Sequence, residues 1–243
     1  MLKGRRLLVL LAALAMAALT ARLGWWQLDR AAQKVRLQQT LQQRHAEPPL
    51  PATELARDAA AVPAQADRRI VLEGRWQAAA TIYLDNRQMN DRAGFYAVTP
   101  LLLDDGSAVL VQRGWVPRDP AERTHIVAPP PPAGRVRVAG RIAPALSRMF
   151  EFSAVASGPI RQNLDLQTYA RETSLALRPL AVVQEEDPAP PDGLLRQWPA
   201  PASDLQKHYG YAFQWFAMSA LIIGLYAWFQ LIRPRRRPAS ADA

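Results

Sequence analysis

The 243-residue sequence contains no cysteine and only three histidines. Without thiols the chain has no cysteine nucleophile, no CxxC redox pair and no cysteine-based metal site. The HExxH pattern of metalloproteases and the GxSxG pattern of serine hydrolases are also missing, as is a glycine-rich phosphate loop. The sequence therefore shows no enzyme active site, and we expect a protein that is not an enzyme.

A basic stripe is also missing, although the formal net charge is +9. Much of that excess lies near the two ends of the chain, while arginines and acidic residues are interspersed between them. The basic residues near the ends are Lys3, Arg5, Arg6, Arg233, Arg235, Arg236 and Arg237. No nucleic-acid-binding motif accompanies the charge, so we expect no nucleic-acid partner.

Two long apolar runs lie just inside these basic ends, and each is long enough to cross a lipid bilayer. Basic flanks stay on the cytoplasmic side of a membrane, so both ends should lie inside and the residues between the runs outside. The predicted division is a cytoplasmic tail at 1–6, a transmembrane helix at 7–28, a periplasmic domain at 29–207, a second transmembrane helix at 208–232 and a cytoplasmic tail at 233–243.

The first run also resembles a secretory signal, with a small-residue cleavage site near Leu19-Thr20-Ala21. We favour an uncleaved anchor, because Trp25 and Trp26 suit the outer interface of a spanning helix. In the second run, small residues recur every three or four positions, which indicates a face for close contact with the first anchor or a partner protein. They are Ala217, Ala220, Gly224 and Ala227.

The segment between the runs changes character twice. Residues 29–47 continue the first helix and should end at Pro48-Pro49, and a linker rich in proline and alanine is predicted up to Ala66. Strand patterns then begin, with a turn signal at Asp85-Asn86 and a hairpin loop at 104–107. The predicted strands are 70–76, 81–84, 94–103, 108–115, 135–142 and 179–184, and a short helix is predicted at 164–173. The fold class is a membrane protein of α+β type, in which two transmembrane helices flank a mostly antiparallel β domain, either a small barrel or a curled sheet.

His208 lies at the outer end of the second run, on one helical face with Tyr211 and Trp215. A neutral imidazole there can donate an axial bond to haem iron while flat aromatic rings pack against the porphyrin. An ordinary interfacial histidine among belt aromatics explains the same residues, and composition alone favours that explanation. The other histidines, His45 and His125, have no partner at metal-ligand spacing.

Several separated blocks, in order along the chain, resemble the family of Surfeit locus protein 1, the Shy-type assembly factors of haem-copper cytochrome oxidase. The blocks are 24–30, 83–87, 94–101 and 105–117, followed by His208 with Tyr211 and Trp215. One departure is Gln112, where family members often carry asparagine before the Arg-Gly-Trp sequence.

The resemblance implies a factor that helps to deliver or insert haem a into the catalytic subunit of cytochrome c oxidase. It also implies that His208 is the axial iron ligand, with Tyr211 and Trp215 lining the cofactor site. The implied partners are that catalytic subunit, haem a synthase and the lipid bilayer. The short N-terminal segment and the abundance of alanine, arginine and proline favour a bacterial plasma membrane with both termini cytoplasmic.

Two alternatives remain open from the sequence. The protein could be a haem-independent chaperone or scaffold that holds the nascent oxidase subunit by contact alone. More remotely, it could be an envelope sensor or scaffold with no link to respiration.

Overall fold

The computed structural model describes residues 2–122, 125–146, 158–186, 188, 191–198 and 205–233. The chain divides into two compact units. One unit, the helix pair, combines residues 1–40 with residues 200–243, and the other, the β domain, is Leu41–Pro199.

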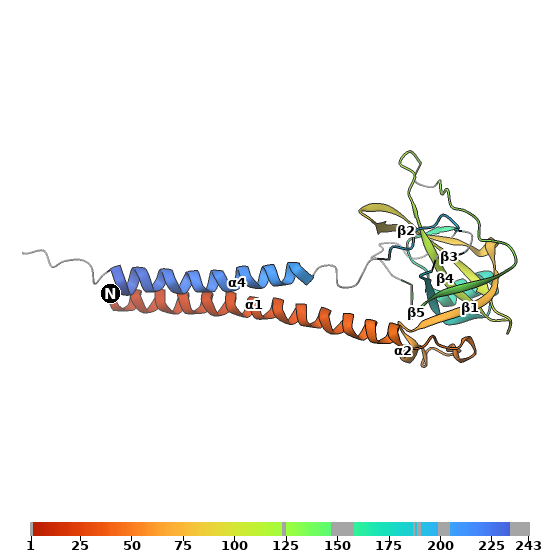
Figure 1. Ribbon diagram of the computed structural model, residues 1–243. Coiled ribbons are helices and arrows are strands. Elements are labelled where there is room, and N and C mark those ends of the chain that lie inside the picture. The colour runs from red at the N-terminus through yellow and green to blue at the C-terminus, as the bar shows by residue number, and fades with distance from the viewer. Residues whose placement is uncertain are drawn as a thin grey trace, which may run out of the picture. The chain divides into compact units, whose positions relative to one another are not determined.

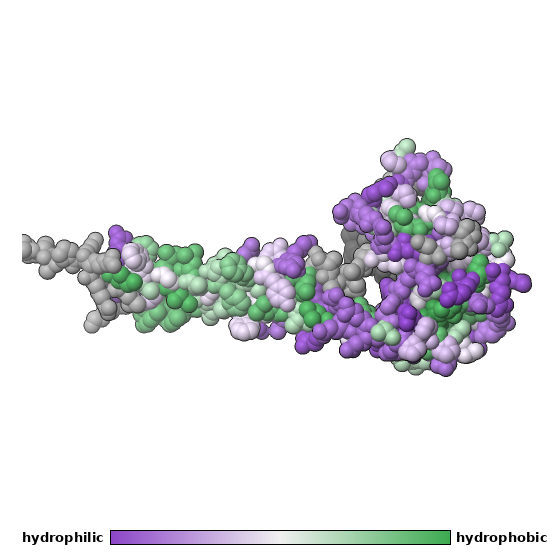
Figure 2. Space-filling model, viewed as in Figure 1, coloured by the Kyte–Doolittle hydropathy of each residue, from purple (hydrophilic) through white to green (hydrophobic). Residues whose placement is uncertain are grey.

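The helix pair is formed by α1 (Leu2–Ala46) and α4 (Leu205–Tyr226), which lie side by side (Figure 1). A π-helical segment, η3 (Ala227–Ile232), continues α4. Both helices are long and apolar enough to cross a membrane, and only 17% and 6% of their most apolar stretches are buried within the protein. Apolar residues cover the visible face of the pair along much of its length (Figure 2). Leu8 and Phe213 are two of the exposed apolar side chains. A core helix of a soluble protein would be covered by its neighbours, so the two helices fit the predicted membrane spans.

The two helices meet along a narrow seam of small and polar side chains. Ala17, Thr20 and Ala31 of α1 and Ala212 and Ser219 of α4 are buried along it. When Gly24 and Gln27 of α1 and Trp215 of α4 are added, the seam positions alternate between spacings of three and four residues. This is the 3.5-residue period of helices that pack in a left-handed supercoil.

A hydrogen bond and an aromatic pair are among the contacts that hold the seam together. The Ser219 hydroxyl donates a hydrogen bond to the Ala17 carbonyl at 2.9 Å, and the Trp25 and Phe216 rings meet edge to face at 5.9 Å. At Gly24 an added Cβ would lie 2.8 Å from the Phe216 ring, so glycine allows this close approach.

The predicted contact between the anchors is confirmed, but α1 does not meet the small-residue face of α4, and contact of that face with a partner protein stays a prediction. Ala217, Ala220 and Gly224 are exposed, whereas the buried positions Ala212 and Ser219 lie on another side of α4. Small residues are frequent all round this helix, so their spacing alone did not identify the face that meets α1.

The β domain is built on one seven-stranded sheet of order β1-β5-β7-β4-β3-β2-β6. Its strands are β1 (Arg69–Trp76), β2 (Ile82–Met89), β3 (Arg92–Leu102), β4 (Ala108–Pro117), β5 (Arg135–Ala143), β6 (Ile160–Arg161) and β7 (Leu177–Gln184). β1 also pairs with the end of β3, so the sheet curls back on itself, while β2 and β6 extend beyond that ring. Among the strand pairs in the described residues only β4–β7 and β2–β6 are parallel, which confirms the predicted curled, mostly antiparallel sheet.

Short helices complete the domain: η1 (Ala52–Glu54), α2 (Val62–Gln65), η2 (Ala78–Ala80) and α3 (Leu166–Thr173). α3 begins where the Asp165 carboxylate accepts a hydrogen bond from the Thr168 N–H at 2.9 Å, which is the usual N-cap arrangement. As predicted, α1 ends just before Pro48-Pro49, because proline lacks the N–H that would continue the helix.

The segment predicted as a linker is instead part of the core. Leu50, Leu55 and Val62 are buried in one hydrophobic cluster with β1 residues such as Leu72. Leu50 also forms a β-bridge to Ile70. Prolines and alanines between these apolar residues hid the pattern, since no helical or strand period is kept across the segment.

The predicted turn at Asp85-Asn86 is also wrong. β2 continues through it with a bulge, in which Asn86 has a φ of 59° and its N–H donates to the Asp85 carboxylate at 2.6 Å. The hairpin turns instead at Asn90 and Asp91, with φ of 50° and 58°. Asn and Asp tolerate this backbone region, so both sites carry the same local signal.

Candidate functional site

His208 lies in the first turns of α4, half-buried, with its Nδ1 atom 2.7 Å from the Oε1 atom of Gln27 on α1. An imidazole that donates from Nδ1 to an amide oxygen keeps its lone pair on Nε2. Among the described residues, no hydrogen bond joins Nε2 to the protein. The arrangement leaves one nitrogen of His208 available to a ligand.

The aromatic candidates are placed differently from each other. Helical periodicity puts Trp215 almost in line with His208, two turns along, and rotates Tyr211 by about 60° from that line. Tyr211 is 51% exposed, whereas Trp215 is half-buried. The helix therefore presents His208 with an open aromatic ring on one side, while Trp215 continues the seam.

The donor set fits a haem better than a bare metal ion. Within the described residues no group of three or more His, Asp or Glu side chains could hold a metal. A single imidazole would suffice for haem, because the porphyrin would supply the iron with its remaining nitrogen ligands and would need only apolar surface beside it. His208 with the exposed rings of Tyr209 and Tyr211 offers those features.

The other two histidines belong to the β domain and lie on its surface. His125 Nδ1 is 3.0 Å from the Asp119 carboxylate, and this hydrogen bond raises the pKa of His125. His45 is exposed, 3.9 Å from the Glu185 carboxylate. Both histidines are more than half exposed, and exposed contacts of this kind contribute little to stability.

A buried charge cluster lies inside the β domain, and the sequence did not predict it. Asp192 accepts hydrogen bonds from Arg113 at 3.1 Å and from Arg196 at 2.6 Å, and all three side chains are less than 10% exposed. Arg113 also lies over the Trp76 ring, 5.3 Å from its centre. Burial alone would raise the pKa of Asp192, but the hydrogen bond and charge of Arg196 and the charge of Arg113 outweigh it and hold that pKa below its usual value.

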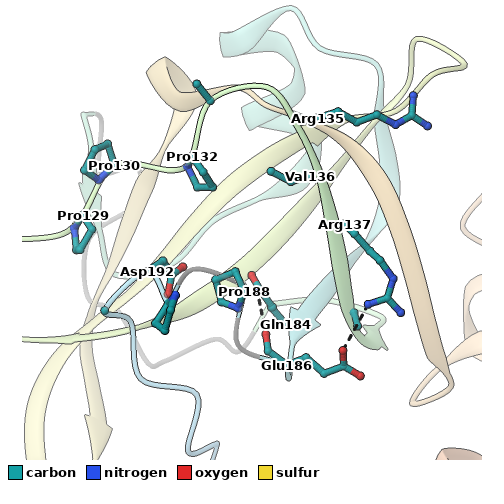
Figure 3. Close-up of a pocket in the computed structure, with 14 residues that line it drawn as sticks. Pro129, Pro130, Pro132, Arg135, Val136, Arg137, Gln184, Glu186, Pro188 and Asp192 are labelled. Carbon is teal, nitrogen blue, oxygen red and sulfur yellow. Dashed lines mark hydrogen bonds and ion pairs between the residues drawn. The ribbon is translucent and has the colours of Figure 1, made fainter.

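An open hollow of about 960 Å³ lies next to this cluster (Figure 3). Proline rings form one side of it, Asp192 reaches its wall, and Arg137 and Glu186 form an ion pair at 3.6 Å along its rim. The residues that line the hollow come from two stretches of the sequence, one beginning at Pro129 and the other at Gln184, so no local motif marks it.

The sequence blocks at 83–87, 94–101 and 105–117 lie mainly in β2, β3 and β4, which pair with one another. The buried Trp115 ring donates a hydrogen bond from Nε1 to the Arg87 carbonyl at 2.9 Å. A Cβ at Gly94 would lie 2.1 Å from the Val116 carbonyl oxygen, and the strand pairing leaves no room for one. Trp115 and Gly94 therefore have structural roles in these blocks, one as a buried ring and the other at a position with no room for a side chain.

Comparison with known proteins gives one family. The model of the SURF1 family matches residues 14–220, from within α1 to within α4. A search of curated protein sequences finds no match. The match covers most of both helices and the entire β domain, and the chain therefore belongs to the SURF1 family, which is associated with the assembly of cytochrome c oxidase.

Proposed function

We propose that the protein assists haem a delivery during the assembly of cytochrome c oxidase. In this role it receives haem a from haem a synthase and presents it to the catalytic subunit of the oxidase. Family membership supports oxidase assembly, and the arrangement of His208 beside Gln27 is the observation that carries the haem-specific part.

Membrane placement is part of the proposal. Basic residues lie at the end of each apolar helix that is nearer to a chain terminus, which favours cytoplasmic termini. The β domain is then in the periplasm of a bacterial plasma membrane. His208 then lies at the outer end of its span, where aromatic side chains prefer the level of the lipid headgroups.

In this proposal the protein only binds and releases haem and catalyses no reaction. His208 would offer its Nε2 lone pair to the iron of a bound haem, and the exposed Tyr211 ring would offer apolar surface beside it. The haem would supply the iron that this imidazole holds. A single protein ligand suits a carrier, since the transfer of its cargo requires only one bond from the protein to be broken.

Complementing a deletion strain with wild type or a variant distinguishes the delivery role from a haem-free scaffold. We expect wild type to restore the haem a content of the oxidase and H208A to leave it several-fold lower. The haem a absorbance of membranes per unit of catalytic subunit is the measurement. H45A is the matched control and should behave as wild type, since His45 is exposed on the β domain.

Equal haem a content with H208A and wild type would contradict delivery through His208. That outcome would favour the scaffold alternative, in which the protein holds the oxidase subunit by contact alone.

A further inference from the structure

We infer that Gln27 is a positioning residue for His208, and that its amide oxygen fixes the imidazole tautomer that can bind iron through Nε2. This inference rests on the proposed function and adds to it a residue that orients the iron ligand. The juxtaposition of the two side chains depends on two helices whose contacting residues are 181 positions apart in the sequence.

The seam of the helix pair places the two side chains. Gln27 follows Thr20 and Gly24 at the same alternating spacing along α1, and His208 precedes Ala212 in the same way along α4. The nearby Phe216 ring packs against Gly24, so the helices lie close enough for the short reach from amide to imidazole. Gln27 and His208 are both half-buried, which limits competition from water for the hydrogen bond.

The direction of this hydrogen bond decides whether His208 can act. When Gln27 Oε1 accepts, the proton lies on Nδ1 and the Nε2 lone pair is free. With the amide reversed, its NH₂ would donate to Nδ1, and the proton would lie on Nε2 and block the iron. Because histidine ligands of metals commonly donate their second N–H to an oxygen, the first arrangement is the one a ligand needs.

The chemical nature of the partner also sets how tightly iron is held. A carboxylate on Nδ1–H makes a stronger hydrogen bond and a more electron-rich imidazole than a neutral amide does. Gln27 is therefore suited to a ligand that is oriented but still releases its cargo. Glutamate at this position should favour retention, and leucine should favour loss.

The first test needs no haem. Nitrogen NMR of imidazole-labelled full-length protein in micelles reports which ring nitrogen carries the proton, and H208A identifies the His208 signals among the three histidines. We expect the Nδ1–H form in wild type and a mixture of tautomers in Q27L. A wild-type His208 protonated on Nε2 would overturn the inference, as would a Q27L spectrum identical to that of wild type.

The second test uses protein purified after co-expression with the haem a synthesis enzymes. We expect transfer of haem to a haem-free acceptor globin to be about tenfold faster from Q27L and about tenfold slower from Q27E. The iron–histidine stretching frequency should fall in Q27L and rise in Q27E, a change that a purely structural role for Gln27 would not produce. Q38L is the control, since Gln38 is exposed on the same helix, and it should match wild type.

The outcomes separate the two proposals. Haem retained by H208A would defeat the proposed function itself. Haem lost from H208A, with transfer rates and stretching frequencies unchanged in Q27L and Q27E, would defeat only the role of Gln27.

Discussion

Replacing Asp192 by alanine is expected to lower the free energy of unfolding of the β domain by about 3–5 kcal/mol. The substitution takes the Asp192 carboxylate away from the guanidinium groups of Arg113 and Arg196, whose side chains are only 2% and 4% exposed. Domains are typically stable by about 5–15 kcal/mol, so this loss is a large share of the total. For a domain of this size the melting temperature should fall by roughly 6–20 °C, measured by circular dichroism on the full chain in detergent.

The pH dependence of the melting temperature tests whether the loss comes from the Asp192 charge. Because the folded-state pKa of Asp192 is held below its ordinary value of 3.8, its contribution is present above that pH. It is lost as the pH falls through the lower folded-state pKa. Wild type should therefore lose stability in acid relative to D192A, and the two melting temperatures should converge.

The matched control is E73A. Glu73 pairs with Arg135 at 3.0 Å, but both side chains are more than half exposed, so the change should cost less than about 1 kcal/mol. If D192A melted as high as E73A, the cluster would not have the role that its burial implies.

Cysteine labelling should give an all-or-none answer on the membrane arrangement. The natural chain has no cysteine, so a single introduced cysteine is the only site that a thiol reagent can modify. In spheroplasts, a membrane-impermeant maleimide should label E54C, on the exposed surface of the β domain, and should not label A241C. Both should react once the membrane is permeabilised.

The control for this experiment is reagent access. A241C must be labelled in detergent, which shows that the introduced thiol is reactive. Labelling of A241C but not E54C in intact spheroplasts would reverse the predicted orientation. Labelling of both would remove the second span, which is the one that lies between the two positions.

Local patterns were enough to predict much of the architecture. Both apolar helices, the polar extension that ends before Pro48-Pro49, and the hairpin joined by residues 104–107 follow from composition and periodicity. Each of these elements is specified by neighbours in the sequence, so a reading along the chain recovers it.

Features that depend on distant partners were missed. Residues Leu50, Leu55 and Val62 show no period of their own, and only the sheet they cover makes them core. No local pattern in the sequence links Asp192 to Arg113, because the two residues are 79 positions apart. The turn at Asn90 was misplaced because Asn86 carries the same local preference, and only strand pairing distinguishes a bulge from a turn.

In the candidate site one residue was predicted from the sequence and its partner was not. His208 was predicted from its place at the end of an apolar run and from the family resemblance. Its partner Gln27 lies within the block at 24–30 that carried the resemblance, yet nothing in the sequence joins the two residues. The contact arises only because small residues let α1 and α4 pack closely.

The most direct test of the account is the absorption spectrum of the purified protein, made together with the haem a synthesis enzymes, with its pigment extracted and identified. We predict haem a on the wild-type protein, on H45A and on H125A, and its loss from H208A. Wild-type protein without haem, or H208A with a full complement of it, would contradict the claim that this histidine holds the cargo.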